Sequence, residues 1–494
     1  MNFTIVTLGC KVNQYESQAM EQWLTQRGHT EVGPDGTFDL AIVNTCTVTA
    51  VADKKNRNVI RRIRKQSPGA VVAVCGCYSQ VKPEDIRDLG VDVISGSAGR
   101  EAFLELALQT VADRQRREAL DEALKRRQFE ILPAGGLSTR TRSMLKVQDG
   151  CSNFCSYCII PYARGPVRSL PLAEAVAQAK QLAAEGYREI VITGIEIASW
   201  GWDFHDGSSL VQLLDAICAA VPAVRIRLGS LEPRIIDQAF CRVMAAHKNL
   251  CPHFHLSMQS GSDTVLARMR RKYDTARYYE SVALLKAAFP GCAVTTDMIV
   301  GFPGETEAEF AESLAFIRKC GFAAMHVFPY SRRPGTPADK MPGQLGNAVK
   351  EARSAAAIAV AGEMNRAFRE RMIGTVQAVL FEEEATGGRQ QATGDAPVGA
   401  DAHIGPPASN EAAGGRQQIS PTAAQISIPQ DPADDDRLLT HAMNGAQCAP
   451  LQCWTGHAPN SIRVYAPGEA LHNQVLPVRI TGLYEDGLLG ETVL

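Results

Sequence analysis

The chain has 494 residues, 45% hydrophobic and 21% charged, the composition of a globular protein long enough for about three domains. Its formal net charge of −2 excludes a uniformly basic nucleic-acid-binding surface, so any such binding must come from local patches. The sequence does not open with a basic segment and an apolar core, and no apolar run reaches the length of a membrane span. We therefore expect a cytoplasmic protein with no membrane partner, whose 14 cysteines suit metal binding better than disulfides.

Residues 1–113 are predicted to alternate between strands and helices. Short apolar runs are separated by stretches of helical length, which is typical of a parallel α/β sheet. The predicted strands are 4–10, 40–46, 70–77 and 91–96, and the predicted helices are 16–29 and 52–66. We therefore expect an N-terminal α/β domain.

Residues 114–135 are charged and then contain proline and glycine, which predicts a linker. A second series of strands and helices follows, and six βα units in this length predict an incomplete (β/α) barrel over 136–371. The predicted strands are 144–149, 189–194, 224–230, 253–260, 294–301 and 323–331, and a long helix is predicted at 347–371.

The last part of the chain, 372–494, changes to short β strands, predicted at 374–382, 461–466 and 475–484. Asp486-Gly487 is a hairpin signal, so a small β-barrel is expected. The segment 385–450 interrupts it and is rich in Gly, Ala, Pro and Gln with few aromatic residues. Such a composition cannot bury enough apolar surface to offset chain entropy, which predicts a disordered insertion.

The strongest chemical motif is Cys151-x3-Cys155-x2-Cys158, just after the first predicted barrel strand. Three thiolates can hold three irons of a [4Fe–4S] cluster and leave the fourth open to the amino and carboxylate groups of S-adenosylmethionine (SAM). The alternatives are a zinc site or buried structural thiols. Structural zinc normally has four N or S ligands, and no fourth Cys or His lies nearby in the sequence.

A second set of cysteines is dispersed in the N-terminal domain. Cys10, Cys46 and Cys77 each end a predicted strand, and the carboxyl ends of neighbouring parallel strands share one edge of a sheet. The three thiols can therefore converge into a second three-thiolate site. The alternative is that each cysteine is a small buried hydrophobe, and Cys75, on the same strand face as Cys77, leaves the third member open.

The predicted helix after Cys46 carries many positive charges and only one acid, Asp53. Such runs are usually solvated helix faces, but this imbalance indicates contacts with RNA phosphates. The basic residues are Lys54, Lys55, Arg57, Arg61, Arg62, Arg64 and Lys65. Arg140 and Arg142, just before the barrel, are weaker candidates.

Several segments resemble the radical-SAM methylthiotransferases. They include LGCKVNQYES (8–17), VNTCTVT (43–49), DGCSNFCSYCIIPYARGPVRS (149–169) and TTDMIVGFPGETE (295–307). The C-terminal β segment is similar to the TRAM domain of that family, a small RNA-binding barrel. The resemblance covers nearly everything except 385–450. It implies two [4Fe–4S] clusters, with Cys77 rather than Cys75 in the second, together with SAM, an electron donor such as flavodoxin or ferredoxin, a sulfur source and a monomeric protein.

The residues after Cys10 bear on the sub-type. The ribosomal-protein aspartate sub-type usually has Pro-Lys there and the isopentenyladenosine sub-type Gln-Met, whereas this chain has Lys11-Val12. The resemblance therefore implies 2-methylthiolation of N6-threonylcarbamoyladenosine at tRNA position 37, in the anticodon loop. The other two sub-types are the alternatives, with a non-catalytic iron–sulfur RNA-binding protein as a rival class.

Barrel residues at strand ends are candidates for holding SAM or substrate. By resemblance to the superfamily, Tyr157 lies against the adenine of SAM and Gly194 near its amino group. Residues at later strand ends could bind ribose, carboxylate or substrate, or could simply cap helices and sheet edges. They are Ser230, Glu232, Gln259 and Asp297. His253 and His255 alternate on a strand, and we expect them to be packed or solvated rather than ligands.

Overall fold

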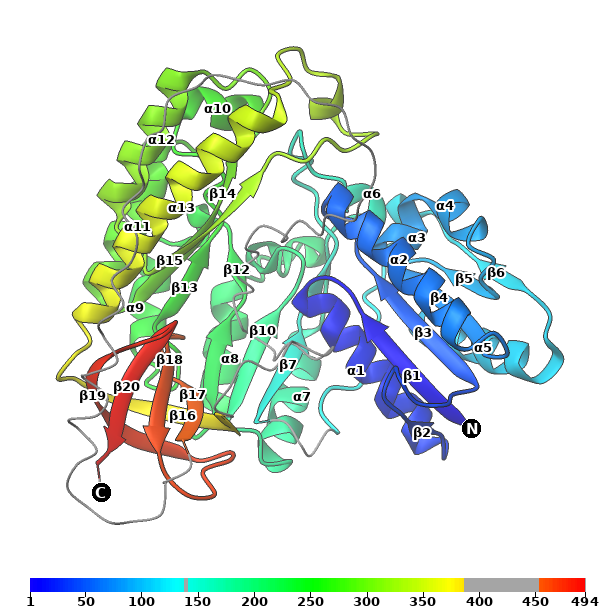
Figure 1. The fold of residues 1–494 in the computed structure, drawn as a ribbon. Coiled ribbons are helices and arrows are strands. Elements are labelled where there is room, and N and C mark those ends of the chain that lie inside the picture. Colours follow the sequence, from blue (N-terminus) through cyan, green and yellow to red (C-terminus); the bar gives the residue numbers. More distant parts are fainter. Residues whose placement is uncertain (137–140, 386–452, 494) are drawn as a thin grey trace, which may run out of the picture. The chain divides into compact units, whose positions relative to one another are not determined.

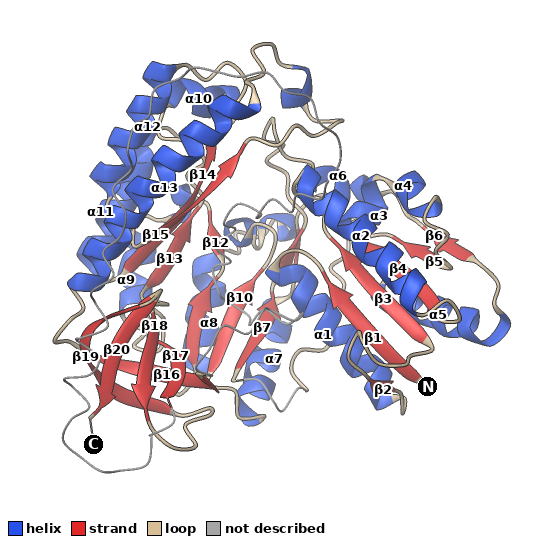
Figure 2. Ribbon diagram, in the orientation of Figure 1, coloured by secondary structure: helices blue, strands red, loops and turns tan. Residues whose placement is uncertain are grey.

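The computed structural model describes residues 1–136, 141–385 and 453–493 (Figure 1). The predicted insertion 385–450 lies, apart from its first residue, outside this range, as does Arg140. Mixed α/β architecture with parallel sheets and a C-terminal barrel is confirmed (Figure 2). Within the described ranges, no helix has both the length and the apolar character needed to cross a membrane.

The N-terminal sheet has six parallel strands in the order β2-β1-β3-β4-β5-β6. The strands are β1 (Asn2–Thr7), β2 (Thr30–Glu31), β3 (Leu40–Thr45), β4 (Val71–Gly76), β5 (Val93–Ser95) and β6 (Arg117–Ala119). The helices are α1 (Lys11–Gln26), α2 (Ala50–Gln66), α3 (Cys77–Val81), α4 (Pro83–Arg87) and α5 (Arg100–Asp113). The central strands β3 and β4 are buried along their whole length because helices cover both faces.

Two boundaries differ from the sequence prediction. Helix α1 begins at Lys11 instead of residue 16, because Cys10 takes the N-cap position directly after the turn that follows β1. Strand β6 lies inside the predicted linker and pairs with β5, so part of that charged segment extends the sheet.

The central barrel is built from parallel strands in two hydrogen-bonded groups, β11-β10-β7 and β12-β13-β14-β15. Strands β11 and β12 follow each other in the chain and are separated only by Gly229. The strands are β7 (Arg142–Lys146), β10 (Glu189–Thr193), β11 (Arg225–Leu228), β12 (Ser230–Leu231), β13 (His253–Leu256), β14 (Ala293–Val300) and β15 (Ala324–Pro329). A short antiparallel pair, β8 (Gln148–Asp149) and β9 (Arg168–Ser169), lies beside them.

Helices cover the outer side of the barrel strands (Figure 1). They are α7 (Leu172–Ala184), α8 (Leu210–Ala220), α9 (Gln238–Ala245), α10 (Asp263–Arg268), α11 (Thr275–Ala288), α12 (Glu307–Cys320) and α13 (Asn347–Glu370), with short α6 (Ile160–Arg164) after the cysteine motif. Along β14, half-buried Thr295, Asp297 and Ile299 alternate with fully buried residues, and Tyr278 of α11 contacts buried Thr296. The half-buried side chains therefore face the barrel interior.

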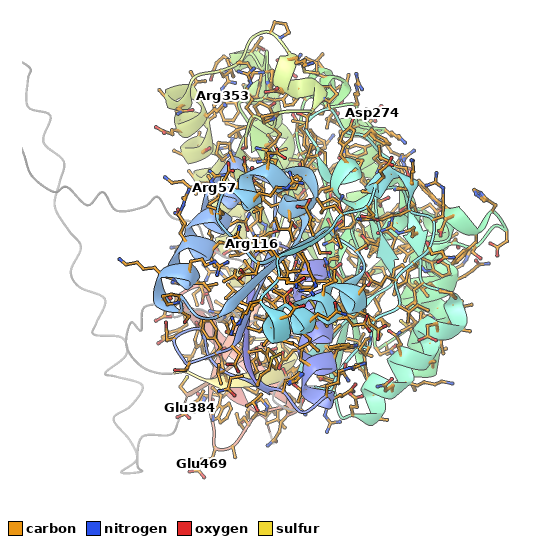
Figure 3. The ribbon with its side chains drawn as sticks, turned by 90° about the vertical axis from the view of Figure 1, so that its right-hand side faces the viewer. Arg57, Arg116, Asp274, Arg353, Glu384 and Glu469 are labelled. Carbon is orange, nitrogen blue, oxygen red and sulfur yellow. The ribbon has the colours of Figure 1, made fainter. Side chains whose placement is uncertain are left out.

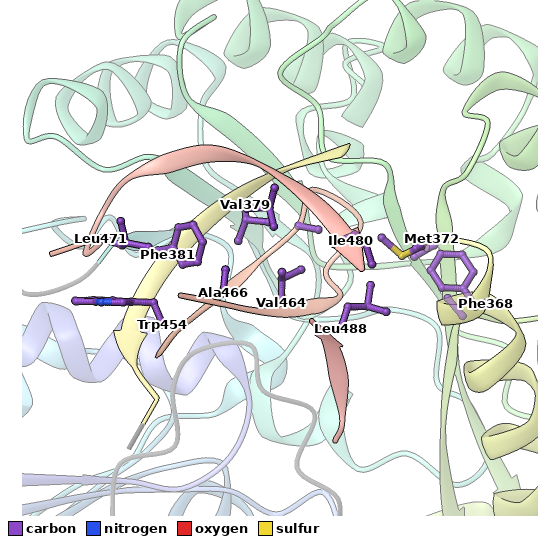
Figure 4. Packing of buried hydrophobic residues seen from close by; sticks show 14 residues of the cluster. Phe368, Met372, Val379, Phe381, Trp454, Val464, Ala466, Leu471, Ile480 and Leu488 are labelled. Atoms are coloured by element: carbon purple, nitrogen blue, oxygen red, sulfur yellow. The ribbon is translucent and has the colours of Figure 1, made fainter. Parts of the chain in front are cut away.

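The C-terminal segment is a closed five-stranded barrel in the order β16-β17-β18-β20-β19. Its strands are β16 (Val376–Glu384), β17 (Cys453–His457), β18 (Arg463–Pro467), β19 (Val475–Tyr484) and β20 (Gly487–Thr492). Figure 4 shows its apolar core, which contains Val379, Phe381, Val464 and Ile480 and is extended at one end by Met372 and by Phe368 of α13. Closure leaves no free sheet edge, which suits so small a β unit.

Candidate functional site

The three N-terminal cysteines follow three adjacent strands. Cys10 follows β1, Cys46 follows β3, and Cys77 opens α3 directly after β4. Gly9 permits the close approach, since its φ is +119° and an added Cβ would lie 2.7 Å from the Cβ of Cys46. Burial, and next the neighbouring Cys10 and Cys77, raise the pKa of the Cys46 thiol to about 12. The three thiols are thus close enough to interact electrostatically.

Cys75 lies apart from this triad. Strand β4 ends at Gly76, whose φ of +110° turns the chain, so Cys75 and Cys77 do not continue the alternation of one strand. Cys75 packs in the apolar cluster that includes Phe103 of α5, and its burial raises its pKa to about 11. Cys77 therefore meets Cys46, whereas Cys75 is a core side chain.

The second triad lies in the loop between β8 and α6. The backbone N–H of Cys158 donates to the carbonyl of Cys155 at 3.0 Å, which folds the loop tightly. Burial raises the pKa of both Cys151 and Cys158 to about 12, and neighbouring Cys155 contributes to each shift. Phe154 has a φ of +48°, a left-handed conformation that is unusual for a non-glycine residue.

Among residues in the described ranges, no three Cys, His, Asp or Glu side chains are grouped so that they could hold a metal ion. A cubane cluster has a different requirement, because each thiolate binds a separate iron and the ligands surround the cluster. Three converging thiols without a fourth ligand fit such a cluster better than structural zinc, which normally has four ligands.

An arginine contacts each triad, buried Arg164 in one case and half-buried Arg271 in the other, and neither arginine was singled out from the sequence. Arg164 of α6 donates from Nε to the Sγ of Cys77 at 3.1 Å. Arg271, after α10, donates from Nη1 to the Sγ of Cys155 at 3.3 Å and from Nε to the Tyr273 hydroxyl at 2.9 Å. Cationic donors of this kind stabilise thiolate sulfur. The only sequence signal was their place in segments that resemble the methylthiotransferases, 149–169 for Arg164 and HLSMQSGSDTVLARMRRKY (255–273) for Arg271.

Buried ionic side chains from the N-terminal helices and from the barrel part surround Arg164. Glu16 of α1 pairs with Arg100 at 2.8 Å, with Lys146 at 3.1 Å and with Arg164. Asp149 pairs with Lys146 at 2.8 Å and with Arg168 at 3.4 Å. A separate buried ion pair, at 2.9 Å, joins Arg333, which follows β15, to Asp53 of α2. The pairs of Glu16 with Lys146 and Arg164, and of Asp53 with Arg333, join the N-terminal α/β part to the barrel part.

The predicted SAM residues border the second triad, and the structure adds Glu196 to them. Tyr157 is half-buried and packs beside the apolar cluster that contains Phe302. Burial and the neighbouring Cys155 raise the pKa of Tyr157, and the charge of Arg271 opposes this shift. Gly194 follows β10, where an added Cβ would lie 2.9 Å from the carbonyl oxygen of Gln148. Glu196, two residues on, has a buried Oε1 without a hydrogen-bond partner.

The environment of Glu196 is unusual for a carboxylate. Burial, and next the charge of Glu232, raise its pKa to about 7. Glu232 itself is half-buried and bonds Arg234 at 2.9 Å. The charge of Glu196 contributes to the raised pKa of Cys151, so this carboxylate lies near the second triad. An orphaned buried oxygen at this position is suited to accept a hydrogen bond from an ammonium group such as that of SAM.

The other predicted residues line the barrel interior. Ser230 and Ser257 form a hydroxyl pair at 2.9 Å, and Gln259 has a φ of +71° while its backbone pairs with β14. Asp297 contacts His255 at 3.3 Å and His326 at 3.2 Å. Burial opposes ionisation of Asp297, but the two imidazoles hold its pKa well below its ordinary value.

The basic residues of α2 divide into two groups. Arg57 (Figure 3) donates to the Tyr78 hydroxyl, and Arg64 is paired with Asp92 at 2.7 Å, so both are tied to the protein. Five remain exposed, namely Lys54, Lys55, Arg61, Arg62 and Lys65. Arg142, expected at a surface, is instead buried against Glu189 and Glu382.

The fold and the site define a radical SAM enzyme. Residues 145–317 match the family model of the radical SAM superfamily, and residues 2–96 match that of an uncharacterized protein family, UPF0004. Among solved structures, the radical SAM methyltransferase TsrM from Kitasatospora setae has a TM-score of 0.52 over 68% of this chain and 73% of its own. The two are 15% identical, so the likeness concerns the fold alone.

Curated relatives are much more similar. The threonylcarbamoyladenosine tRNA methylthiotransferase MtaB of Bacillus subtilis is 42% identical over 76% of this chain and 84% of its own. The MtaB of Thermotoga maritima is 38% identical over 76% and 86%. A tRNA-2-methylthio-N(6)-dimethylallyladenosine synthase of Pelotomaculum thermopropionicum is 31% identical over 77% and 87%. The chain belongs to the methylthiotransferase family of radical SAM enzymes, which use SAM and [4Fe–4S] clusters.

Proposed function

We propose that this protein converts N6-threonylcarbamoyladenosine at tRNA position 37 into its 2-methylthio derivative. The observation that carries the proposal is the pair of cysteine triads, each with an arginine that donates to one of its thiols, Arg164 to Cys77 and Arg271 to Cys155. The choice of substrate rests on the MtaB relatives, which are 42% and 38% identical, against 31% for the dimethylallyladenosine enzyme of P. thermopropionicum.

Cys151, Cys155 and Cys158 would hold the cluster that binds SAM, and Cys10, Cys46 and Cys77 would hold the second. When bound, the cluster and SAM supply the one-electron chemistry that an unactivated adenine C2–H bond requires. The barrel interior surrounds that chemistry with protein and limits the access of water. A one-electron donor such as flavodoxin or ferredoxin and a source of sulfur are the partners this reaction needs, and we propose that a monomer carries it out.

The chain's own groups near Cys151 would orient SAM. The orphaned Oε1 of Glu196 would accept a hydrogen bond from the amino group of SAM, whose positive charge favours the ionised carboxylate. Tyr157 would lie against the adenine ring. Glu232, Ser230 and Gln259, farther along the strand ends, would hold the ribose or the carboxylate, and Asp297 with its two imidazoles would face the substrate.

The division of labour follows the three segments. We propose that 1–113 holds the second cluster and 136–371 forms the SAM barrel, with 114–135 between them. The closed barrel of 372–494 would hold the RNA as a TRAM-like unit, with the exposed cations of α2 touching its phosphates. A single-stranded anticodon loop suits such a protein because its bases can be turned outward into a pocket.

Reversing charge on α2 should weaken tRNA binding. Lys54 and Lys55 are exposed and neither forms an ion pair with another described residue, so Lys54→Glu with Lys55→Glu replaces two proposed phosphate contacts by repulsion. We expect a lower affinity and a shallower salt dependence, by about 0.7 to 0.9 in logarithmic slope for each lost contact. Binding to tRNA across a salt series measures both.

The matched control reverses two exposed lysines on barrel helices and loops, Lys180→Glu with Lys248→Glu. This variant has the same net charge, so it should lose only the general electrostatic attraction and keep the slope of wild type. Equal salt-dependence slopes in the two double variants would mean that α2 does not contact the RNA phosphates.

The substrate is tested by nucleoside mass spectrometry of tRNA from cells lacking this protein. We expect loss of the 2-methylthio form with retention of threonylcarbamoyladenosine. In a strain also lacking threonylcarbamoylation, we expect no methylthio product on unmodified adenosine, because a pocket built around polar atoms rejects a base without them. Loss of the methylthio-isopentenyl nucleoside instead would identify the dimethylallyladenosine reaction, the second candidate on the strength of the P. thermopropionicum relative.

A further inference from the structure

We propose that Arg164 is a positioning residue that sets the reduction potential of the cluster held by Cys10, Cys46 and Cys77. The inference rests on the proposed function in one respect, the existence of this second cluster. Arg164 belongs to α6, six residues after Cys158, yet its Nε reaches the Sγ of Cys77 at 3.1 Å. One residue of the SAM-binding segment thus touches a ligand of the other cluster.

The guanidinium is held in one orientation. Its Nη2 donates to Asn13 Oδ1 at 2.9 Å, and both Nη atoms bond the carboxylate of Glu16. Asn13 in turn donates to the carbonyl of Thr45 at 2.9 Å, directly before Cys46. The side chain of Arg164 has no exposed surface, so water cannot take over any of these contacts. A planar fork with this many fixed partners keeps Nε directed at sulfur.

Charge balance indicates why a cation is buried there. The ionic side chains around Arg164 comprise two buried carboxylates and four buried cations, with half-buried Glu130 beside Arg100. They are Glu16 and Asp149, and Arg100, Lys146, Arg164 and Arg168. Positive charge therefore exceeds negative charge even when Glu130 is included. Three thiolates on a [4Fe–4S] core make an anion, which balances the excess.

The same geometry gives the direction of the effect. A hydrogen bond and a positive charge at a ligand sulfur favour the more negative, reduced cluster and so raise its reduction potential. Arg271 is placed to do this for the other cluster through Cys155, but its anchors are Tyr273 and the carbonyl of Ser257 instead of a carboxylate. Each cluster therefore has its own arginine, and the two potentials can be set separately.

The test is a redox titration followed by electron paramagnetic resonance on anaerobically reconstituted protein. Each Arg164 variant is measured in the C151A/C155A/C158A background, where only the second cluster remains. We expect Arg164→Gln to shift its potential to a more negative value and Arg164→Lys to shift it less. Arg100→Gln is the matched control, since Arg100 is equally buried and pairs with Glu16 but donates to no cysteine of the described ranges, so the potential should not move.

An unchanged potential in Arg164→Gln, or an equal shift in Arg100→Gln, would overturn the proposal. If Arg164→Gln loses its iron, its potential cannot be measured, and the iron content of Arg100→Gln then decides whether Arg164 acts on the cluster directly. Iron retained in Arg100→Gln supports a direct effect of Arg164 on the cluster. Iron lost from Arg100→Gln as well would show that the network serves folding only. If the C151A/C155A/C158A protein holds no iron before any arginine is changed, the second cluster does not exist, and the proposed function fails with it.

Discussion

Replacing Cys151, Cys155 and Cys158 together by alanine is expected to abolish SAM cleavage and to remove about half of the bound iron, because each triad holds one cluster. Replacing Cys10, Cys46 and Cys77 should also remove about half of the iron but leave production of 5′-deoxyadenosine. The two effects separate because one triad follows strands of the N-terminal sheet, the other lies in the loop after β8, and no cysteine belongs to both. Iron analysis and chromatography of the SAM cleavage product measure them.

Cys75→Ala is the control for the N-terminal variant. Cys75 lies two residues from Cys77 but packs in the core beside Phe103, so its loss should leave the iron content unchanged and cost only some stability. An N-terminal triple variant with all its iron would contradict the two-cluster reading, and loss of half the iron from Cys75→Ala would reopen the choice between Cys75 and Cys77.

The sequence predicted the central strands of both parallel sheets because strands buried on both faces are continuous apolar runs. The same argument could not find β6, whose residues Arg117–Ala119 are polar and largely exposed, nor β17, whose Cys453–His457 has no clear alternation of apolar and polar residues. Both strands form because they pair with neighbouring strands: β6 pairs with β5, and β17 pairs with β16 and β18. Such tertiary pairing leaves little trace in local sequence.

The candidate site, like the fold, was only partly predictable from the sequence. Cysteines at strand ends could be grouped by sheet topology alone. The separation of Cys75 from Cys77 depends on the positive φ of Gly76, which strand periodicity does not predict. Arg164 and Arg271 could not be distinguished from surface arginines, because their contacts depend on residues far away in the sequence, Glu16 at 148 positions for Arg164 and Cys155 at 116 positions for Arg271. On α2, only the fold reveals that Arg64 is fixed by Asp92.

Glu16→Leu is expected to lower the free energy of unfolding by ~3–5 kcal/mol, the cost of breaking a buried ion pair by removing one partner. Glu16 is fully buried and pairs with three cations, Arg100, Lys146 and Arg164, which would all lose a counter-charge in a buried site. Urea titrations of the reconstituted protein measure the loss. The control is Glu101→Leu, because Glu101 and Arg27 form an exposed pair at 3.9 Å, and such pairs contribute about 0–1 kcal/mol.

The pH dependence of the same variant gives a second, independent test. Burial alone would raise the pKa of Glu16, but Arg100, Arg164 and Lys146 hold it well below its ordinary value. A carboxyl whose pKa is depressed by folding stabilises the native state above its unfolded pKa of about 4.3 and loses that contribution as pH falls toward the folded pKa. The difference in stability between wild type and Glu16→Leu should therefore be full at pH 7 and shrink in acid. A difference that stays constant from pH 7 to pH 3 would mean that packing, and not the charge of Glu16, joins the N-terminal sheet to the barrel.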